Sequence, residues 1–303
     1  MKYVLEYPSE RPGASEAFLH PEVIRELTVA AEECGFDAVA LSEHPAPSLK
    51  WRRNGGHNTL DPIAALSYIA GVTARIRLLT NLYVLPFRNP YLSAKALGSL
   101  DIVSGGRLIA GVGAGYLRAE FAALGIDHTR RGRLLDESLE AVCRIWSEPE
   151  SPVTGEGFGA PGPVWMQSPV QRPHPPLWIG GNGAAARRRV VRHGAGWMPI
   201  IADRGMAAAM RTTAIENAED FTSGVDGLRR ELAAAGRDPG SVDIQIVCPV
   251  VDFTDRSSVR AAIEVLEDLG KRGATWAVVH ADSASPDAAV RSIRAFADSV
   301  IAG

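Results

Sequence analysis

The stretch Trp178-Ile179-Gly180-Gly181-Asn182-Gly183 sets the interpretation of the whole chain. A short apolar run ends here in a glycine turn, and an alanine- and arginine-rich segment follows at once. This is the pattern of a strand, a tight turn and the start of a helix. Free backbone N–H groups at a helix start bind anions, and glycine lets a phosphate approach the backbone closely. The stretch therefore predicts a βα unit that holds a phosphorylated ligand. A plain strand-to-helix turn gives the same pattern and is the alternative.

Seven more strand-like runs alternate with helical segments along the chain. Several are nearly continuous in Val, Ile, Leu and Ala, which is typical of parallel strands covered on both faces. Eight such units favour an α/β fold with a single (β/α)8 barrel domain over residues 1–303, and a doubly wound sheet is the alternative. The predicted strands lie near residues 2–6, 37–42, 76–82, 107–112, 176–180, 196–201, 243–250 and 275–281.

Capping residues and apolar stripes mark the helices. Asp61-Pro62 and Ser285-Pro286 each place a capping oxygen before a proline at the first helical position. Residues 148–176 are rich in Pro and Gly and predict a long insertion after the fourth helix, either a lid that shapes the substrate pocket together with loop 45–58 or a plain surface excursion. A further helix has its apolar stripe predicted at Leu92, Ala96, Leu100 and Val103.

Composition bounds the class of protein. The chain has 46% hydrophobic and 22% charged residues and a net charge of −3, which argues against a nucleic-acid partner. The three cysteines, Cys34, Cys143 and Cys248, are far apart and odd in number, as expected of reduced thiols. No run resembles a secretory leader or reaches the length of a membrane span. The sequence therefore predicts a cytoplasmic protein without a membrane partner.

The carboxyl ends of the predicted strands supply the catalytic candidates, because barrel active sites lie there. His44 follows the second strand and is interpreted as the only histidine at a strand end on this face; its imidazole can move a proton near neutral pH. Glu43 adjoins it, although neighbouring residues on extended backbone point to opposite faces. A rim histidine bonded to a loop carbonyl is the alternative to a catalytic His44.

The glycine run at 111–115, the histidines and cysteines, and the arginine run at 187–189 do not match the known cofactor or metal motifs. Gly111-Val112-Gly113-Ala114-Gly115 lacks the third glycine of a dinucleotide fingerprint, because Tyr116 stands there. It predicts either a tight turn or a place where a flat group approaches the backbone. The seven histidines and three cysteines show no metal-binding spacing, so no metal site is predicted. In the run Arg187–Arg189, one or two side chains at most can face an anion.

These stretches together resemble the bacterial luciferase-like flavin/deazaflavin oxidoreductases, and most of all their branch that uses coenzyme F420, an 8-hydroxy-5-deazaflavin. The resemblance covers roughly residues 20–200 in order; that branch commonly has Asp-His where this chain has Glu43-His44. The matching stretches are Gly35–Val39, Glu43–Pro47, Thr59–Pro62, Thr73–Leu78, Pro90–Lys95, Leu100–Arg107, Gly111–Phe121, Pro173–Asn182 and Gly194–Pro199.

The resemblance implies a homodimer of (β/α)8 barrels with the cofactor ring in the barrel mouth. It implies a non-proline cis peptide at Asn81-Leu82 beneath the ring, and His44 beside the ring as proton donor or substrate orienter, with Glu43 as a second catalytic candidate. Gly180, Gly181 and Asn182 would meet the cofactor phosphate. The other implied cofactor-binding residues are Thr80, Asn81, Leu82, Gly111, Val112, Gly113 and Ala114.

Three functions remain open from the sequence. The favoured one is an F420-dependent oxidoreductase, in which a hydride passes between the deazaflavin and a small organic substrate while His44 supplies or removes a proton. The second is an FMN-dependent monooxygenase fed by a separate reductase. The third is a flavin-binding protein without turnover, which a titratable group beside the ring argues against.

Overall fold

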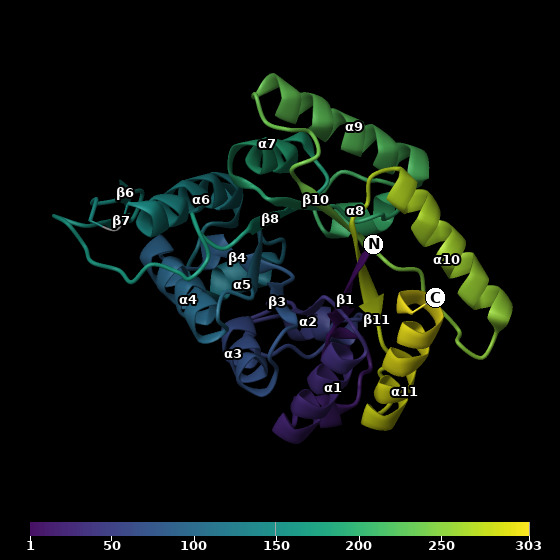
Figure 1. The fold of residues 1–303 in the computed structure, drawn as a ribbon. Helices are drawn as coiled ribbons and strands as arrows, with labels where there is room; N and C mark the ends of the chain where they lie inside the picture. Colours follow the sequence, from purple (N-terminus) through teal and green to yellow (C-terminus); the bar gives the residue numbers. More distant parts are fainter. Residues whose placement is uncertain (149, 303) are drawn as a thin grey trace.

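Eight parallel strand positions close into a barrel in the computed structural model, which describes residues 1–148 and 150–302 (Figure 1). Neighbouring strands pair in parallel. β3 and β4 both pair with β5, so together they form the third strand of the barrel. The predicted (β/α)8 barrel is confirmed, with every predicted strand within a few residues of its expected bounds. The barrel strands are β1 (Lys2–Glu6), β2 (Ala38–Leu41), β3 (Arg77–Thr80), β4 (Tyr83–Val84), β5 (Leu108–Gly113), β8 (Leu177–Gly180), β9 (Gly196–Met198), β10 (Asp243–Val247) and β11 (Trp276–His280).

Helices surround the barrel and alternate with its strands (Figure 1). Asp61 caps the start of α3 and Ser285 caps the start of α11, so both predicted capping sites are confirmed. The α-helices are α1 (Pro21–Glu33), α2 (Leu49–Arg53), α3 (Pro62–Val72), α4 (Pro90–Val103), α5 (Arg118–Ala123), α6 (Arg131–Ser147), α7 (Ala184–His193), α8 (Arg204–Ala209), α9 (Ala218–Ala234), α10 (Arg256–Lys271) and α11 (Pro286–Phe296). Shorter helical turns are η1 (Pro8–Glu10), η2 (Glu16–Leu19), η3 (Leu85–Phe87), η4 (His128–Arg130) and η5 (Ala297–Ile301).

Two tryptophans fill the inside of the barrel. Trp178 of β8 and Trp276 of β11 meet edge to face with ring centroids 5.0 Å apart, and both are buried. A glycine makes room for them, because a Cβ on Gly196 would lie 2.3 Å from Cδ1 of Trp178. The interior is therefore a packed core, and ligands must bind at the ends of the strands.

The predicted apolar stripe of α4 is confirmed at Leu100, which is fully buried, but not at its two ends. Leu92 is 64% exposed and Val103 is 62% exposed, whereas Ala94 and Leu97 of the same helix are fully buried. The ends of the stripe are misplaced because the buried face of α4 also includes the polar residues Ser93 and Asp101, so apolar spacing alone does not define it. The consequence is an apolar surface on the outside of the barrel.

The predicted insertion after the fourth barrel helix, α6, lies outside the barrel rather than over its mouth. It contains the hairpin of β6 (Thr154–Gly155) and β7 (Phe158–Gly159), which projects beside α6 (Figure 1). Oδ2 of Asp101, near the end of α4, accepts the amides of Val170 at 2.7 Å and Gln171 at 2.9 Å. The chain then enters β8 from its amino end, so the structure favours the surface excursion over the lid. Residue 149 of this segment lies outside the described residues.

Candidate functional site

His44 and Glu120 form a close pair at the carboxyl ends of the strands. His44 follows β2, and Glu120 lies in α5, the short helix after β5. Nδ1 of His44 is 3.3 Å from both carboxylate oxygens of Glu120. The two side chains are 9% and 3% exposed, so their interaction is shielded from water. A carboxylate that orients an imidazole in this way is suited to proton transfer.

Aromatic rings cover the imidazole of His44. Its centroid is 4.5 Å from that of Trp51, 5.5 Å from that of His57 and 5.9 Å from that of Tyr116. Trp51 and His57 belong to loop 45–58, whose predicted place at the pocket is consistent with these contacts. The rings leave the imidazole in a water-poor setting, where its interactions with a polar substrate group are stronger.

Glu43 points away from His44 and anchors the third strand position. Its Oε2 accepts the amide of Val84 at 2.6 Å, and its Oε1 accepts a hydrogen bond from Nη2 of Arg88. The side chain is 1% exposed. Since both oxygens are used by the β4–η3 segment, the catalytic interpretation of Glu43 is not supported, and Glu120 is the carboxylate that reaches the imidazole. Opposite orientation of adjacent residues on extended backbone is the physical reason.

The position of His280 corrects the prediction that His44 is the only histidine at a strand end. His280 ends β11 on the same face as His44. Its Nε2 is 2.8 Å from Oε2 of Glu6, and its Nδ1 is 3.2 Å from Nη1 of Arg11. The strand prediction over 275–281 already contained the signal, because it ends at this residue.

Glu10 is a buried carboxyl group at the same end that the sequence-based predictions omit. It is 5% exposed, and its Oε2 accepts hydrogen bonds from the amide and the hydroxyl of Ser42. Oε1 is buried with no hydrogen-bond partner among the described residues, and Nδ1 of His57 is 3.8 Å from Oε2. Burial raises the pKa of Glu10 to about 8, with the Glu6 carboxylate adding to the rise. Its position four residues after β1 is the sequence signal that could have found it.

Glu10 should make the stability of the protein depend on pH. The folded state keeps this proton up to about pH 8, whereas an ordinary glutamate releases it near 4.5. Between these values the folded state binds more protons, so the free energy of unfolding falls as pH rises. We expect Glu10→Gln to flatten this fall, as measured by chemical denaturation from about pH 5 to about pH 8. Equal pH slopes for the wild type and the variant would contradict a neutral Glu10.

The glycines that end β5 and β8 pack against the bulge of the third strand. The Asn81-Leu82 peptide bond is cis, as the resemblance predicts. A Cβ on Gly113 would lie 2.8 Å from Cδ1 of Leu82, and one on Gly180 would lie 2.2 Å from the same atom. The side chain that approaches these glycines from within the protein is Leu82. The glycines position the bulge, and this is their direct structural role.

The remaining residues of β5 divide between the two faces of the strand. A Cβ on Gly111 would lie 2.0 Å from the carbonyl oxygen of Thr80, and the Thr80 hydroxyl donates to the Gly111 carbonyl at 2.8 Å. Val112 is fully buried in the core between barrel and helices, so its side chain does not face the predicted cofactor site. Alternation along a strand explains this, since residues next to inward glycines point outward. Ala114 follows β5 and is partly buried against the same core.

Asn182 holds the glycine turn in shape. Its Nδ2 donates to the carbonyls of Ile200 and Thr213 at 2.7 Å, and its Oδ1 accepts the amide of Ile200 at 2.8 Å. The Asn182 amide donates to Oγ1 of Thr212 at 2.9 Å. Since these atoms are all engaged, Asn182 positions the turn and is not free to bind a phosphate with its side chain.

The start of α7 has free backbone amides, the kind of group that the predicted anion site requires. Gly183 is its N-cap and supplies no side-chain cap, so the first helical amides face outward from the turn. A Cβ on Gly183 would lie 3.3 Å from the Thr213 hydroxyl, and glycine at 181 has a φ of +109°. Bare amides, a nearby hydroxyl and the positive end of the helix dipole suit a phosphate.

A cluster of basic residues includes Arg211, which is next in sequence to a residue that bonds to this turn. Burial, followed by the charges of Arg131, Arg211 and Arg118, lowers the pKa of His128. Burial and the charges of Arg211 and Arg118 likewise lower the pKa of Arg131. Arg211 directly precedes Thr212, which bonds to the turn. Nε2 of His128 is buried without a partner among the described residues. An anion beside Arg211 would relieve this repulsion.

The arginine run of α7 is engaged elsewhere. Arg187 Nε is 3.1 Å from Glu231 of α9, and Arg189 Nε is 2.6 Å from Asp136 of α6. Arg188 is exposed. The run therefore ties α7 to its neighbouring helices.

Two further observations bound the chemistry of the described residues. No group of three or more His, Cys, Asp or Glu side chains among them has the arrangement of a metal site. In residues 1–148 and 150–302, no helix combines the length and apolar character needed to cross a membrane.

At the mouth of a closed (β/α)8 barrel, where barrel enzymes have their active sites, lie an imidazole–carboxylate pair and an uncapped helix start. Residues 1–291 match one family of such barrels, the luciferase-like monooxygenases. An uncharacterised protein of Mycobacterium tuberculosis is 31% identical over 269 residues, which are 83% of this chain and 89% of that protein. The chain belongs to the luciferase-like monooxygenase family, whose members are oxidoreductases and monooxygenases.

Relatives in this family use two different cofactors. An F420-dependent glucose-6-phosphate dehydrogenase of Gordonia bronchialis is 31% identical over 191 residues, which are 61% of this chain and 54% of that enzyme. An FMNH(2)-dependent dimethylsulfone monooxygenase of Pseudomonas putida is 28% identical over 167 residues, which are 54% of this chain and 44% of that enzyme. The family therefore includes both F420-dependent and FMN-dependent members.

Solved structures share the barrel. Monooxygenase RslO1 of Streptomyces bottropensis has a TM-score of 0.80 at 23% identity and covers 100% of this chain and 99% of its own. The coenzyme F420 dependent tetrahydromethanopterin reductase of Methanopyrus kandleri has a TM-score of 0.75 at 17% identity, with 99% and 98% covered. At these identities the likeness establishes the fold.

Proposed function

We propose that this chain is an F420-dependent oxidoreductase in which His44, oriented by Glu120, donates or accepts the proton that accompanies hydride transfer to or from a small organic substrate. The observation that carries the proposal is the pair itself, with Nδ1 of His44 3.3 Å from both Glu120 oxygens. An oriented, shielded imidazole is what a proton-coupled reaction needs and what mere binding does not.

The donors at the glycine turn fit a phosphorylated cofactor. The uncapped start of α7 and the hydroxyl of Thr213 would hold the phosphate, and Arg211 would add charge beside it. Asn182 and Leu82 would shape the site from behind, through the bonds and contacts described above. When bound, a deazaflavin supplies a ring carbon that exchanges a hydride with the substrate.

The protein's own residues would then carry out the rest of the reaction. Trp51 and Tyr116 exclude water from His44. Glu120 fixes the imidazole so that Nε2, the nitrogen not facing the carboxylate, is directed to substrate. Positioning of this kind is worth several orders of magnitude in rate when the reacting groups are held about 3–3.5 Å apart.

The second candidate function is an FMN-dependent monooxygenase. The similarity to an FMNH(2)-dependent relative supports this candidate. A fluorescence titration of the purified protein with F420 and FMN in parallel separates the two. We expect F420 to bind with a Kd of roughly micromolar or tighter and FMN to bind more weakly. The opposite preference would assign the monooxygenase function, and binding of neither would contradict the cofactor site at the glycine turn.

A homodimer formed through the outer face of α3 and α4 completes the proposal. Leu92 and Val103 are exposed there, and an apolar surface on a helix is normally covered. We expect Leu92→Glu to reduce the mass in solution from that of two chains to that of one, as measured by light scattering after gel filtration. The substitution of exposed Val265 on α10 by Glu is the matched control and should not change the mass. A wild type that is already a monomer would contradict the dimer.

A further inference from the structure

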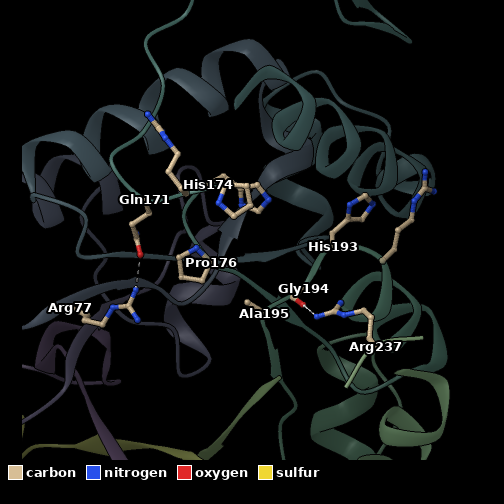
Figure 2. Close-up of a pocket in the computed structure, with 11 residues that line it drawn as sticks. Arg77, Gln171, His174, Pro176, His193, Gly194, Ala195 and Arg237 are labelled. Carbon is tan, nitrogen blue, oxygen red and sulfur yellow. Dashed lines mark hydrogen bonds between the residues drawn. The ribbon is translucent and has the colours of Figure 1, made fainter. Parts of the chain in front are cut away.

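A cavity of about 540 Å³ lies at the end of the barrel opposite His44 (Figure 2). Arg77 begins β3, Pro176 immediately precedes β8, and Ala195 immediately precedes β9, so the cavity is at the amino ends of these strands. Figure 2 shows Arg77 with Gln171 on one side of Pro176 and Ala195, and Arg237 on the other side. The volume is within the range of cavities that bind small molecules.

The wall of this cavity is positively charged. Four arginines and two histidines are among the described residues that line it, and no aspartate or glutamate is. Burial lowers the pKa of the Arg77 guanidinium, which marks it as a cation with restricted access to water. The six basic residues are Arg77, Arg172, His174, Arg192, His193 and Arg237.

Most of these guanidinium groups bond to neutral oxygens, which leaves their charge in place. Arg237 donates to the carbonyls of Val190, Val191 and Gly194 at 2.8–2.9 Å. Nη2 of Arg77 donates to the carbonyl of Leu108 at 3.3 Å and to Oε1 of Gln171 at 3.2 Å. The carbonyls at the end of α7 offset only about half a charge through the helix dipole.

The nearest carboxylates do not neutralise the cavity. The charges of Asp101 and Asp243 raise the pKa of Arg77 without a direct contact, and both carboxylates accept hydrogen bonds from other residues. Glu140 is 2.7 Å from Nη2 of Arg192, an exposed arginine of the wall, and 3.8 Å from Nε2 of His193. Arg77, Arg172 and Arg237 remain without a direct carboxylate partner among the described residues. The cavity therefore keeps a net positive charge.

We propose that this cavity is a second ligand site, separate from the cofactor site, that binds a phosphate monoester or inorganic phosphate. Guanidinium groups are matched to phosphate because their planar N–H groups donate in pairs. Free phosphate would fill only part of the volume, so an organic monoester is expected to bind more tightly than inorganic phosphate. This site stands independently of the proposed reaction, since its residues lie at the opposite end of the barrel from His44.

Isothermal titration of the full chain at low ionic strength, with inorganic phosphate, ribose 5-phosphate and AMP as probes, tests the proposal. The informative variant is Arg172→Glu with Arg192→Glu, because both side chains are exposed. Since Arg192→Glu also removes the ion pair with Glu140, a thermal melt of the variant checks that it is folded. Arg188→Glu with Arg230→Glu is the matched control, as both are exposed on α7 and α9 and neither lines the cavity. We expect affinity for the monoesters to fall by roughly tenfold or more in the first variant and to be unchanged in the control.

The outcomes separate the cavity from the glycine turn. Phosphate that binds only at the turn would be displaced by the cofactor and would bind equally to both variants, which would overturn the proposal. Equal losses of monoester affinity in the two variants would mean that overall charge causes the binding, which would also overturn the proposal. A wild type that binds none of the three probes excludes the site, whatever the cofactor titration gives.

Discussion

Replacement of His44 by glutamine should lower turnover by a factor of about 10²–10⁴, the usual contribution of a positioned acid or base, while the Kd of the cofactor changes by less than about twofold. Glutamine keeps a polar group of similar reach but cannot exchange a proton near neutral pH. The split between turnover and affinity is therefore the signature of a proton-transfer role.

Glu120→Gln should produce a smaller loss with the same split. The amide can still contact Nδ1 of His44, but it no longer carries the negative charge that stabilises a protonated imidazole. We expect turnover to fall below that of the wild type and to stay above that of His44→Gln. Glutamine at 44 in the Glu120→Gln background should add little to the His44→Gln loss, because residues that act as a unit are not additive.

The matched control for both variants is His20→Gln, since His20 is exposed before α1 and remote from β2. It should leave turnover and cofactor affinity unchanged. Unchanged turnover in His44→Gln would remove the proton-transfer role. A parallel loss of cofactor affinity would mean that His44 holds the cofactor instead.

The barrel follows from local patterns that a sequence displays directly. The run of apolar residues bounded by polar ones predicts a strand over 2–6, and β1 lies at Lys2–Glu6. The caps at Asp61 and Ser285 were equally accessible, since a capping oxygen acts on amides two or three residues away. The buried face of α4 is not predictable in this way. Leu92 is apolar yet exposed, because the face that is covered depends on neighbours far away in sequence.

The site was predictable only where position along a strand fixes it. His44 follows β2 and had to lie at the mouth, and the uncapped glycine turn before α7 follows β8 in the same way. Glu120 could not be found by this argument, because it is 76 residues from His44 and enters the site from a helix rather than a strand end. Glu43, the carboxylate beside His44 in sequence, bonds to Val84 and Arg88 instead of the imidazole.

Glu43→Ala should therefore destabilise the protein rather than stop its reaction. We expect the free energy of unfolding to fall by about 3 kcal/mol, near the lower end of the range for removing one partner of a buried ion pair. Arg88 would lose its main partner, and the Val84 amide would lose its acceptor. The loss stays near the lower end because Arg88 is 25% exposed and Asp61 remains 3.6 Å from its Nη2.

Denaturant unfolding of Glu43→Ala, Glu43→Gln and Glu26→Ala distinguishes anchoring from catalysis. Glutamine retains an acceptor for the Val84 amide, so Glu43→Gln should lose less stability than Glu43→Ala. Glu26 is exposed on α1, and its replacement should change stability by less than about 0.5 kcal/mol. Turnover measured well below the melting temperature should be close to that of the wild type for all three. If Glu43→Gln instead kept its stability and lost its turnover, the carboxylate beside His44 in sequence would be catalytic, and the assignment of that role to Glu120 alone would be wrong.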